Sequence, residues 1–313
     1  CDGLRYIQDN LKEYQVSVFV CVPLLLEAMY KKIMLQVEKQ GKSKTVKFGI
    51  KLSRFLLKFG IDIRKKLFKE IHSNLGGKVR LLVAGGAALD PVAEKGFNEL
   101  GITMYQGYGL TETSPTISTN RYGHSKIGTV GQPLPSVLVK LAETGEILAT
   151  GPNVMQGYYN KPEMTAEVID EEGWFHTGDI GEIDKDGFIR ITGRIKNMIV
   201  LSGGKKVFPE EVEAVLETSK LIKELCVMSV KIKSGNKAGT EEVGVVIVPA
   251  DNIASKSDEE LQKLLEDEVK ELSANNLAPY KTPTVVVLHR DELPKTSTRK
   301  VKRKDLQQWY ESL

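Results

Sequence analysis

The sequence is poor in cysteine and has no apolar run long enough to cross a bilayer. Its three cysteines, Cys1, Cys21 and Cys226, are too few and too widely spaced for a disulfide framework or a four-thiolate zinc site. The longest apolar run, residues 16–26, is about half the length of a membrane-spanning helix, and Pro23 interrupts it. No signal peptide is visible. We therefore expect a reducing, cytoplasmic setting.

Acidic residues are scarce in one stretch. The whole chain carries a net charge of +3, but residues 31–80 hold 15 lysines and arginines against three acids. This stretch could rest on an anionic membrane surface, but we favour the alternative, a solvated helical insertion. A second basic run, residues 290–304, holds seven cations without interleaved aromatic side chains. Because the chain as a whole is nearly neutral, we do not expect it to bind nucleic acid.

The first third of the chain alternates between strand and helix patterns. With 313 residues, 41% hydrophobic and 27% charged, the composition is typical of a globular protein of roughly two domains. The pattern predicts strands at 16–23, 78–84 and 102–106, helices between 24 and 75, and a helix to residue 100 that Asp90 caps and Pro91 begins. This alternation favours an α/β layer with mostly parallel strands.

Two further regions with different secondary-structure patterns follow. Short strands at 137–141, 146–150, 179–184 and 188–192, with a helix at 162–170, predict a small β-barrel or sandwich. After residue 196 the pattern predicts a compact α+β unit, with a strand at 198–201, a helix from Pro209, strands at 225–233, 242–248 and 284–288, and helices at 258–275 and after Lys304. We expect domains at 1–195 (α/β layer to about 135, barrel from about 136) and 196–313.

The sequence Gln-Gly-Tyr-Gly-Leu-Thr-Glu-Thr-Ser-Pro has a glycine on each side of its tyrosine. Gly107 and Gly109 let the backbone beside Tyr108 come close to a ligand. Thr111 supplies a hydroxyl and Glu112 a carboxylate, a pair that suits a phosphate together with Mg²⁺. The alternative is a plain turn with a threonine cap.

The sequence Gly-Trp-Phe-His-Thr-Gly-Asp ends in a carboxylate at the start of a predicted strand. Asp179 could accept hydrogen bonds from two ribose hydroxyls, although an Asp after Gly is usually a turn residue. His176 invites a general-base role. Because no partner acid or nucleophile is evident, we favour a structural histidine.

The boundary between the predicted barrel and the predicted α+β unit has the residues expected of a hinge. Arg194 ends a predicted strand, Lys196 lies at the boundary, and Gly203-Gly204 forms a flexible loop. The alternatives are an interdomain turn and a hairpin. The basic run near the C-terminus could bring one lysine to a phosphate.

Taken together and in this order, the motifs resemble the adenylate-forming (AMP-binding) superfamily of acyl-CoA synthetases, peptide-synthetase adenylation domains and luciferases. The resemblance covers essentially the whole chain, and the N-terminal stretch looks most like long-chain fatty acid–CoA ligases. The matching segments are Gly85-Gly86-Ala87, Tyr108-Gly-Leu-Thr-Glu112, Gly145-Glu-Ile through Gly151-Pro, Gly157-Tyr-Tyr with Lys161-Pro162, Trp174-Phe-His-Thr-Gly-Asp179, Gly193-Arg194 and Pro294-Lys-Thr.

The resemblance implies a site for ATP or AMP, Mg²⁺ and coenzyme A. Tyr108 would stack on adenine, Thr111 would hold the α-phosphate and Glu112 would bind Mg²⁺. Asp179 would bind the ribose hydroxyls, and Arg194 the ribose or a phosphate. The other residues that it implies at the nucleotide and acyl pocket are Gly85, Gly86, Ala87, Gln106, Gly107, Gly109, Gly203 and Gly204.

The resemblance also implies a two-step reaction of a fatty acid. The carboxylate and ATP would give acyl-AMP and pyrophosphate, with Lys300 as the adenylation lysine. A small mobile C-terminal domain would then turn about Lys196, and coenzyme A would take the acyl group, with Gly203-Gly204 facing the carbonyl. The alternatives are a fatty acyl-AMP ligase that loads a carrier protein and a catalytically silent nucleotide-binding module.

Some family features are missing. Arg299 stands where the family usually has Gly, and Asn197 where it usually has an acid. The Ser/Thr/Gly-rich phosphate loop that ends in Pro-Lys-Gly is not found in residues 1–80, and no Gly-x-x-x-x-Gly-Lys-Ser/Thr loop is present. We therefore expect the C-terminal portion of a longer enzyme, with little activity of its own.

Overall fold

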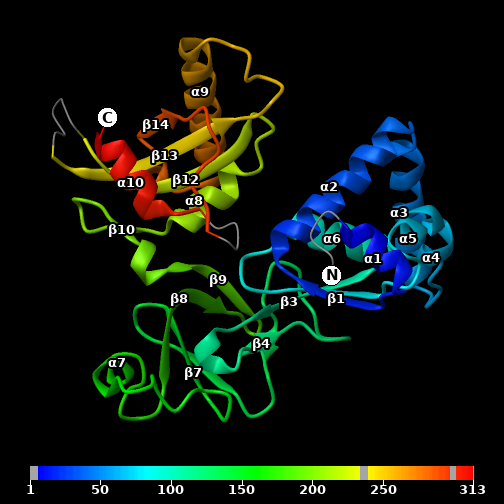
Figure 1. Cartoon of the computed structure of the whole chain (residues 1–313), viewed down its shortest axis with the longest axis horizontal. Coiled ribbons are helices and arrows are strands. Elements are labelled where there is room, and N and C mark those ends of the chain that lie inside the picture. The colour runs from blue at the N-terminus through cyan, green and yellow to red at the C-terminus, as the bar shows by residue number, and fades with distance from the viewer. Residues whose placement is uncertain (1–5, 233–238, 297–300, 313) are drawn as a thin grey trace. The chain divides into compact units, whose positions relative to one another are not determined.

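The computed structural model describes residues 6–232, 239–296 and 301–312. The chain divides into two compact units (Figure 1). The first comprises residues 1–177 with 182–191, and the second comprises residues 178–181 with 192–313.

The first unit contains the predicted α/β layer. Its sheet has the order β1-β2-β3-β4-β5, in which the first three strands are parallel and the last two antiparallel. The strands are β1 (Val18–Cys21), β2 (Leu81–Ala84), β3 (Thr103–Tyr108), β4 (Ser118–Thr119) and β5 (Gln132–Pro133). The helices are α1 (Ile7–Glu13), α2 (Pro23–Lys39), α3 (Ser43–Leu57), α4 (Arg64–Leu67), α5 (Lys69–Asn74) and α6 (Pro91–Glu99).

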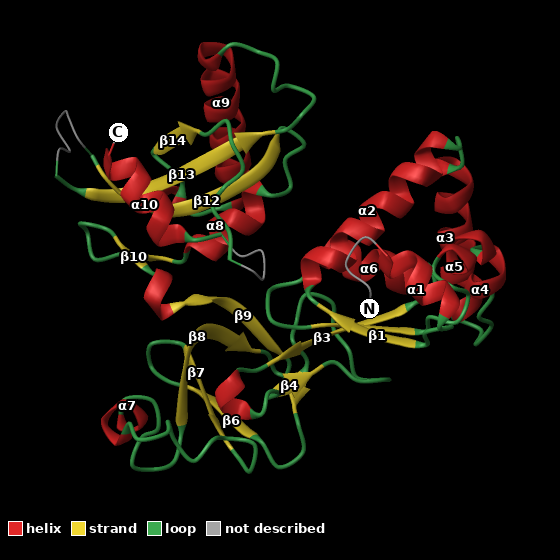
Figure 2. Cartoon of the chain, in the orientation of Figure 1, coloured by secondary structure: helices red, strands yellow, loops and turns green. Residues whose placement is uncertain are grey.

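Helices cover one face of this sheet. Leu82 and Met104 on that face are buried in a core with Leu11 of α1, Leu26 of α2 and Phe97 of α6. Figure 2 shows α1, α2 and α6 on the same side of the strands. The opposite face differs, because the alternate β1 residues, valines 18 and 20, are 42% and 68% exposed. Parallel sheets are usually covered on both faces.

The predicted barrel strands form a four-stranded sheet, a half-barrel, with the order β6-β7-β8-β9. They are β6 (Leu138–Leu141), β7 (Glu146–Thr150), β8 (Phe175–Ile183) and β9 (Ile189–Arg194). Strand β8 begins four residues earlier than predicted, because Gly178, at φ +70°, is accommodated within the strand. Helix α7 (Pro162–Ala166) is shorter than predicted, since Asp170 instead accepts hydrogen bonds from Glu172 and Trp174 in a turn.

The second unit is α+β. Its main sheet has the order β12-β13-β14, with an antiparallel first pair and a parallel second pair. Val245 and Ile247 pack with α8 and α9 on one face, whereas Cys226 and Val246 pack with Leu306 of α10 on the other. The elements are η3 (Ile195–Asn197), β10 (Ile199–Val200), β11 (Lys206–Val207), α8 (Pro209–Leu216), β12 (Ile222–Lys231), β13 (Glu241–Pro249), α9 (Asp258–Asn276), η4 (Pro279–Lys281), β14 (Val285–Leu288) and α10 (Arg303–Ser312). Both units therefore match the predicted fold class.

Among the described residues, no helix combines the length and apolar character needed to cross a bilayer. The predicted cap of α6 is confirmed, because the Asp90 carboxylate accepts a 2.8 Å hydrogen bond from the Val92 amide and Pro91 occupies the first helical position.

This cap gives a stability prediction. Replacing Asp90 with Ala leaves the amide without its acceptor and should lower the free energy of unfolding by about 1 kcal/mol. Asp90→Asn, which can still accept that hydrogen bond, should stay within about 0.5 kcal/mol of the parent. Urea unfolding followed by circular dichroism measures both, and equal losses would contradict the capping role.

Candidate functional site

The carboxyl ends of β2 and β3 lie side by side, because the two strands are parallel neighbours. The loop Gly85-Gly86-Ala87 follows β2, and Gln106, Gly107 and Tyr108 end β3. The buried side chain of Gln106 donates a 3.3 Å hydrogen bond to the carbonyl of Ala87. Ligands of open α/β sheets bind outside the carboxyl ends of the strands, so this is the expected edge for a nucleotide.

A tight turn follows β3. A Cβ on Gly109 would lie 1.7 Å from the carbonyl oxygen of Pro115, so only glycine fits there. The buried hydroxyl of Thr113 accepts a 2.9 Å hydrogen bond from the Leu110 amide. It also lies 3.0 Å from the carbonyl oxygens of Leu110 and Pro115 and donates a hydrogen bond to one of them. The turn contains the 3-10 helix η2 (Thr111–Thr113), and it leaves the side chain of Thr111 exposed.

Glu112 is held at two points. Its backbone carbonyl accepts the Met155 amide at 2.8 Å, and its Oε1 accepts the Tyr158 hydroxyl at 2.9 Å. Burial, followed by the hydrogen bond to Glu112 and its negative charge, raises the pKa of Tyr158 above the ordinary value of a phenol. Within the described residues, no hydrogen bond occupies Oε2 of Glu112.

The donor set at this turn fits Mg²⁺. Thr111 and Glu112 offer a hydroxyl and a carboxylate, and Mg²⁺ is usually held by one or two carboxylates together with substrate phosphates and water. In the described part of the chain, no three His, Cys, Asp or Glu side chains form a metal-binding group.

The ring of Tyr108 is half-buried. It packs against clusters that contain Ile117, Val137 and Ile147. Its backbone carbonyl accepts the Ile117 amide at 2.7 Å, which fixes the end of β3. Apolar side chains thus support the ring, an arrangement suited to stacking against a flat base.

In the second unit, Asp179 and Arg194 form an ion pair. The Arg194 Nε lies 2.7 Å from the Asp179 Oδ1, and the carboxylate is 3% exposed whereas the guanidinium side chain is 52% exposed. The two predicted ligands of the ribose are therefore neighbours. Because the guanidinium is half-exposed, the pair presents N–H donors to a polar ligand beside a nearly buried carboxylate.

Lys196 is exposed within η3, next to the end of β9. A Cβ on Gly193 would lie 2.8 Å from the ring of Phe208, so the chain is tightly packed just before Lys196. The Asn197 amide donates a 2.6 Å hydrogen bond to Oε1 of Glu210. An acid at this position would face another carboxylate, which explains why asparagine is suitable in this chain.

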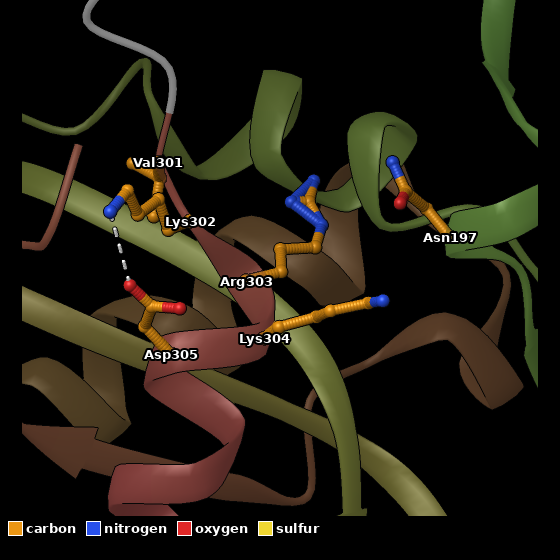
Figure 3. Close-up of a pocket in the computed structure, with 6 residues that line it drawn as sticks. All are labelled: Asn197, Val301, Lys302, Arg303, Lys304 and Asp305. Atoms are coloured by element: carbon orange, nitrogen blue, oxygen red, sulfur yellow. Dashed lines mark ion pairs between the residues drawn. The ribbon is translucent and has the colours of Figure 1, made fainter. Parts of the chain in front are cut away.

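Arg303 lies at the centre of a cluster of charges at the start of α10. Its guanidinium is 2.7 Å from Glu213 and 3.5 Å from Glu210, and 3.8 Å from the Cys226 sulfur. Burial raises the pKa of Glu213 despite this ion pair. Figure 3 shows Arg303 and Asn197 facing each other in a pocket of about 370 Å³, with the Lys302–Asp305 ion pair at its edge.

Gly203 and Gly204 are exposed in the hairpin between β10 and β11, where Gly204 adopts φ +73°. Lys300 and Arg299 lie outside the described residues. The chain on both sides of them is fixed: Lys295 pairs with Val301 in a bridge, and the Lys302 amide donates to the Pro294 carbonyl at 2.8 Å.

The expectation that His176 has no partner acid is wrong. Its Nδ1 lies 3.0 Å from Glu146 of β7, and its Nε2 lies 3.6 Å from Asp170. These contacts link β7, β8 and the turn before β8. Sequence patterns could not reveal this, because Glu146 is 30 residues away.

Each unit gathers its own candidate residues. The first unit brings together the loop after β2, the end of β3 and the η2 turn, and the second unit pairs Asp179 with Arg194. Sequence reasoning gave no role to Thr113, Asn153 or Tyr158. Asn153 donates hydrogen bonds to the carbonyls of Thr113 at 3.1 Å and Thr116 at 2.9 Å, and thus ties a distant loop to the turn.

These features define the class of adenylate-forming enzymes, and comparison with known proteins agrees. The model of the AMP-binding enzyme family matches residues 3–159, and that of the AMP-binding enzyme C-terminal domain matches residues 196–313. The chain belongs to the AMP-binding enzyme family.

Curated relatives include long-chain-fatty-acid–CoA ligase 1 of Cavia porcellus, 31% identical over 99% of this chain and 49% of the relative. FadD15 of Mycobacterium bovis, also a long-chain-fatty-acid–CoA ligase, is 33% identical over 72% of this chain and 40% of its own length. The chain thus spans about half the length of the curated relatives that it matches.

Solved structures share the fold. The ATP-bound RpMatB-BxBclM chimera B1 has a TM-score of 0.73 and 25% identity, covering 99% of this chain and 54% of that one. The anthranilate CoA ligase AuaEII in complex with anthranoyl-AMP has a TM-score of 0.71 and 20% identity, covering 100% of this chain and 54% of that one.

The charge cluster gives a second stability prediction. Arg303→Met should lower the free energy of unfolding by about 3 kcal/mol at pH 7.5, because it leaves two carboxylates without their cation. The matched change Lys304→Met, at an exposed neighbour, should cost less than about 0.5 kcal/mol.

The loss should also depend on pH. The pKa of Glu213 is raised in the folded protein. As the pH falls, Glu213 in folded Arg303→Met therefore takes up a proton before it does so in the unfolded chain. This uptake favours the folded state, so part of the stability lost at pH 7.5 should return at pH 5. Urea unfolding at pH 7.5 and pH 5 measures this. If Arg303→Met loses no more unfolding free energy than Lys304→Met, the ion pairs of Arg303 with Glu213 and Glu210 do not stabilise the fold.

Proposed function

We propose that this chain carries the nucleotide-binding turn and the C-terminal domain of an ATP-dependent fatty acid–CoA ligase. The observation that carries the proposal is the turn after β3, which presents Thr111 and a tethered Glu112. It follows the strand whose Gln106 donates a hydrogen bond to Ala87 in the loop after β2. The long-chain ligases among the relatives support the substrate class. We place the domain boundary between residues 195 and 196.

In the first step, a carboxylate attacks the α-phosphorus of ATP, and both partners are anions. Positioning and charge cancellation must therefore supply most of the rate enhancement. Tyr108 supports the base, Asp179 with Arg194 holds the ribose, and Thr111 holds the α-phosphate. Lys300 bridges the carboxylate and phosphate oxygens. Glu112 would hold Mg²⁺, and the bound ion would offset charge on the pyrophosphate.

In the second step, the coenzyme A thiol attacks the acyl-adenylate carbonyl, and AMP leaves. Lys196 is the pivot between the two steps, so that Lys300 withdraws and the Gly203-Gly204 hairpin meets the acyl group. A carrier protein in place of coenzyme A is the nearest alternative acceptor, and analysis of the product with each acceptor distinguishes them.

The complete reaction needs residues outside this chain. Two β1 valines on one face of the parallel sheet are exposed, and the Ser/Thr/Gly-rich phosphate loop of the family is not found in residues 1–80. We therefore assign the activity to the full-length gene product. The isolated chain turns over ATP slowly or not at all, as a silent nucleotide-binding module would.

Lys300 provides the test of this mechanism. In the full-length gene product, Lys300→Ala should slow adenylation by about 10²-fold or more, the usual scale for a positioned charge. Thioester formation from preformed acyl-AMP should survive. Lys302→Ala, two residues away, should leave both steps within about twofold. Single-turnover assays measure each step, and equal losses in the two steps for Lys300→Ala would refute the division of labour.

We also propose that α3 rests on an anionic membrane. One face of this helix and the turn after it form a cationic–aromatic stripe, in which Phe48 is 66% exposed and Phe59 is 67% exposed. An apolar cavity of about 600 Å³ among the same helices, lined by residues such as Met29, Ile33 and Phe68, would suit an alkyl chain. The stripe consists of Lys44, Lys47, Phe48, Lys51, Phe55, Lys58 and Phe59.

Liposome sedimentation tests the stripe. The chain should bind vesicles that contain phosphatidylglycerol at low salt and should bind the same vesicles less at high salt. It should not bind vesicles of phosphatidylcholine alone. Lys47→Glu with Lys51→Glu should weaken binding at least about tenfold. The same charge change on α9, Lys263→Glu with Lys270→Glu, is the control. Absence of binding at low salt would end the membrane proposal.

A further inference from the structure

Two tyrosines stand next to each other in the loop before α7, in very different surroundings. Tyr159 is 91% exposed, whereas Tyr158 is half-buried and its hydroxyl donates a 2.9 Å hydrogen bond to Oε1 of Glu112, 46 residues earlier in the chain. Only one of the pair can therefore influence the carboxylate, although the two side chains are chemically identical.

The backbone of Tyr158 is itself anchored. Its amide donates a 2.9 Å hydrogen bond to Oγ1 of Thr165 in α7. A Cβ on Gly157 would lie 2.9 Å from the Cγ2 of Thr165, so glycine is needed for the loop to pass this close to the helix. The phenol thus projects from a fixed support rather than from a free loop.

The same loop is bound to the η2 turn at two further points. The Met155 amide donates to the backbone carbonyl of Glu112, and the Asn153 side chain donates to the carbonyls of Thr113 and Thr116. Loop and turn therefore form one hydrogen-bonded body, and the position of the phenol relative to the glutamate backbone is set independently of the glutamate side chain.

We propose that Tyr158 is a positioning residue for the metal-binding carboxylate of Glu112, an inference that rests on the proposed role of Glu112. The phenol holds Oε1 and fixes the side-chain rotamer, which leaves Oε2 to the cation. A free glutamate side chain loses rotational entropy when it binds a ligand, and here much of that loss occurs during folding. Outer hydrogen bonds of this kind typically change metal affinity by about 10- to 100-fold.

Mn²⁺ titration tests this without turnover. Electron paramagnetic resonance reports Mn²⁺ bound to the full-length gene product with a non-hydrolysable ATP analogue. Tyr158→Phe should weaken Mn²⁺ binding about tenfold, and Tyr159→Phe should change it less than twofold. Glu112→Gln, included to test the carboxylate itself, should weaken it at least as much as Tyr158→Phe. AMP binding in EDTA, measured by calorimetry, should stay unchanged in both tyrosine variants.

Each other outcome is decisive. If Glu112→Gln weakens Mn²⁺ binding but Tyr158→Phe behaves like Tyr159→Phe, the positioning role is wrong and the proposed function stands. If Glu112→Gln has no effect, the metal role of Glu112 fails, and the inference fails with it. If Tyr158→Phe lowers metal-free AMP binding by the same factor as Mn²⁺ binding, or does not fold, Tyr158 is a structural residue and the proposal is overturned.

Discussion

The candidate site depends on the hydrogen bonds of the buried Thr113 hydroxyl. The hydroxyl accepts the Leu110 amide and donates to a carbonyl oxygen of the same turn, so that the chain reverses directly after β3. Removing such a hydroxyl would leave a buried amide unsatisfied, at a cost of about 1–3 kcal/mol. The close approach of Gly109 to Pro115 completes the turn. Without this geometry, Glu112 would not lie opposite Tyr158.

The second unit depends on a different constraint, which is the pairing of buried charge. Asp179 is almost inaccessible and is compensated by Arg194, and Glu213 is compensated by Arg303. Arg303 is also three residues after Lys300, so the same ion pairs that stabilise the start of α10 fix one end of the lysine-bearing segment.

The fold was largely predictable because its signals are local. The Asp90-Pro91 sequence predicted the start of α6, and the apolar runs predicted β2, β7 and the strands of the second unit. The predicted bounds of strands and helices were wrong where a residue type suits two kinds of local structure. Gly178-Asp179 has the appearance of a turn but lies within β8, and the segment after Ala166 turns because Asp170 caps the Trp174 amide.

The candidate site was predictable in its motifs but not in its supports. Tyr108, Glu112 and Asp179 stand in recognisable sequences, whereas the Tyr158–Glu112 and His176–Glu146 contacts join residues 46 and 30 positions apart. No periodicity or turn rule encodes such a distance, because the strands and loops between the partners decide it.

The most direct test is a crystal structure of the full-length gene product with ATP and Mg²⁺. The account predicts ribose hydroxyls on the Asp179 carboxylate, adenine against Tyr108, and a Glu112 oxygen about 2.0–2.1 Å from the metal. A nucleotide bound away from the η2 turn, or a metal held without Glu112, would contradict it.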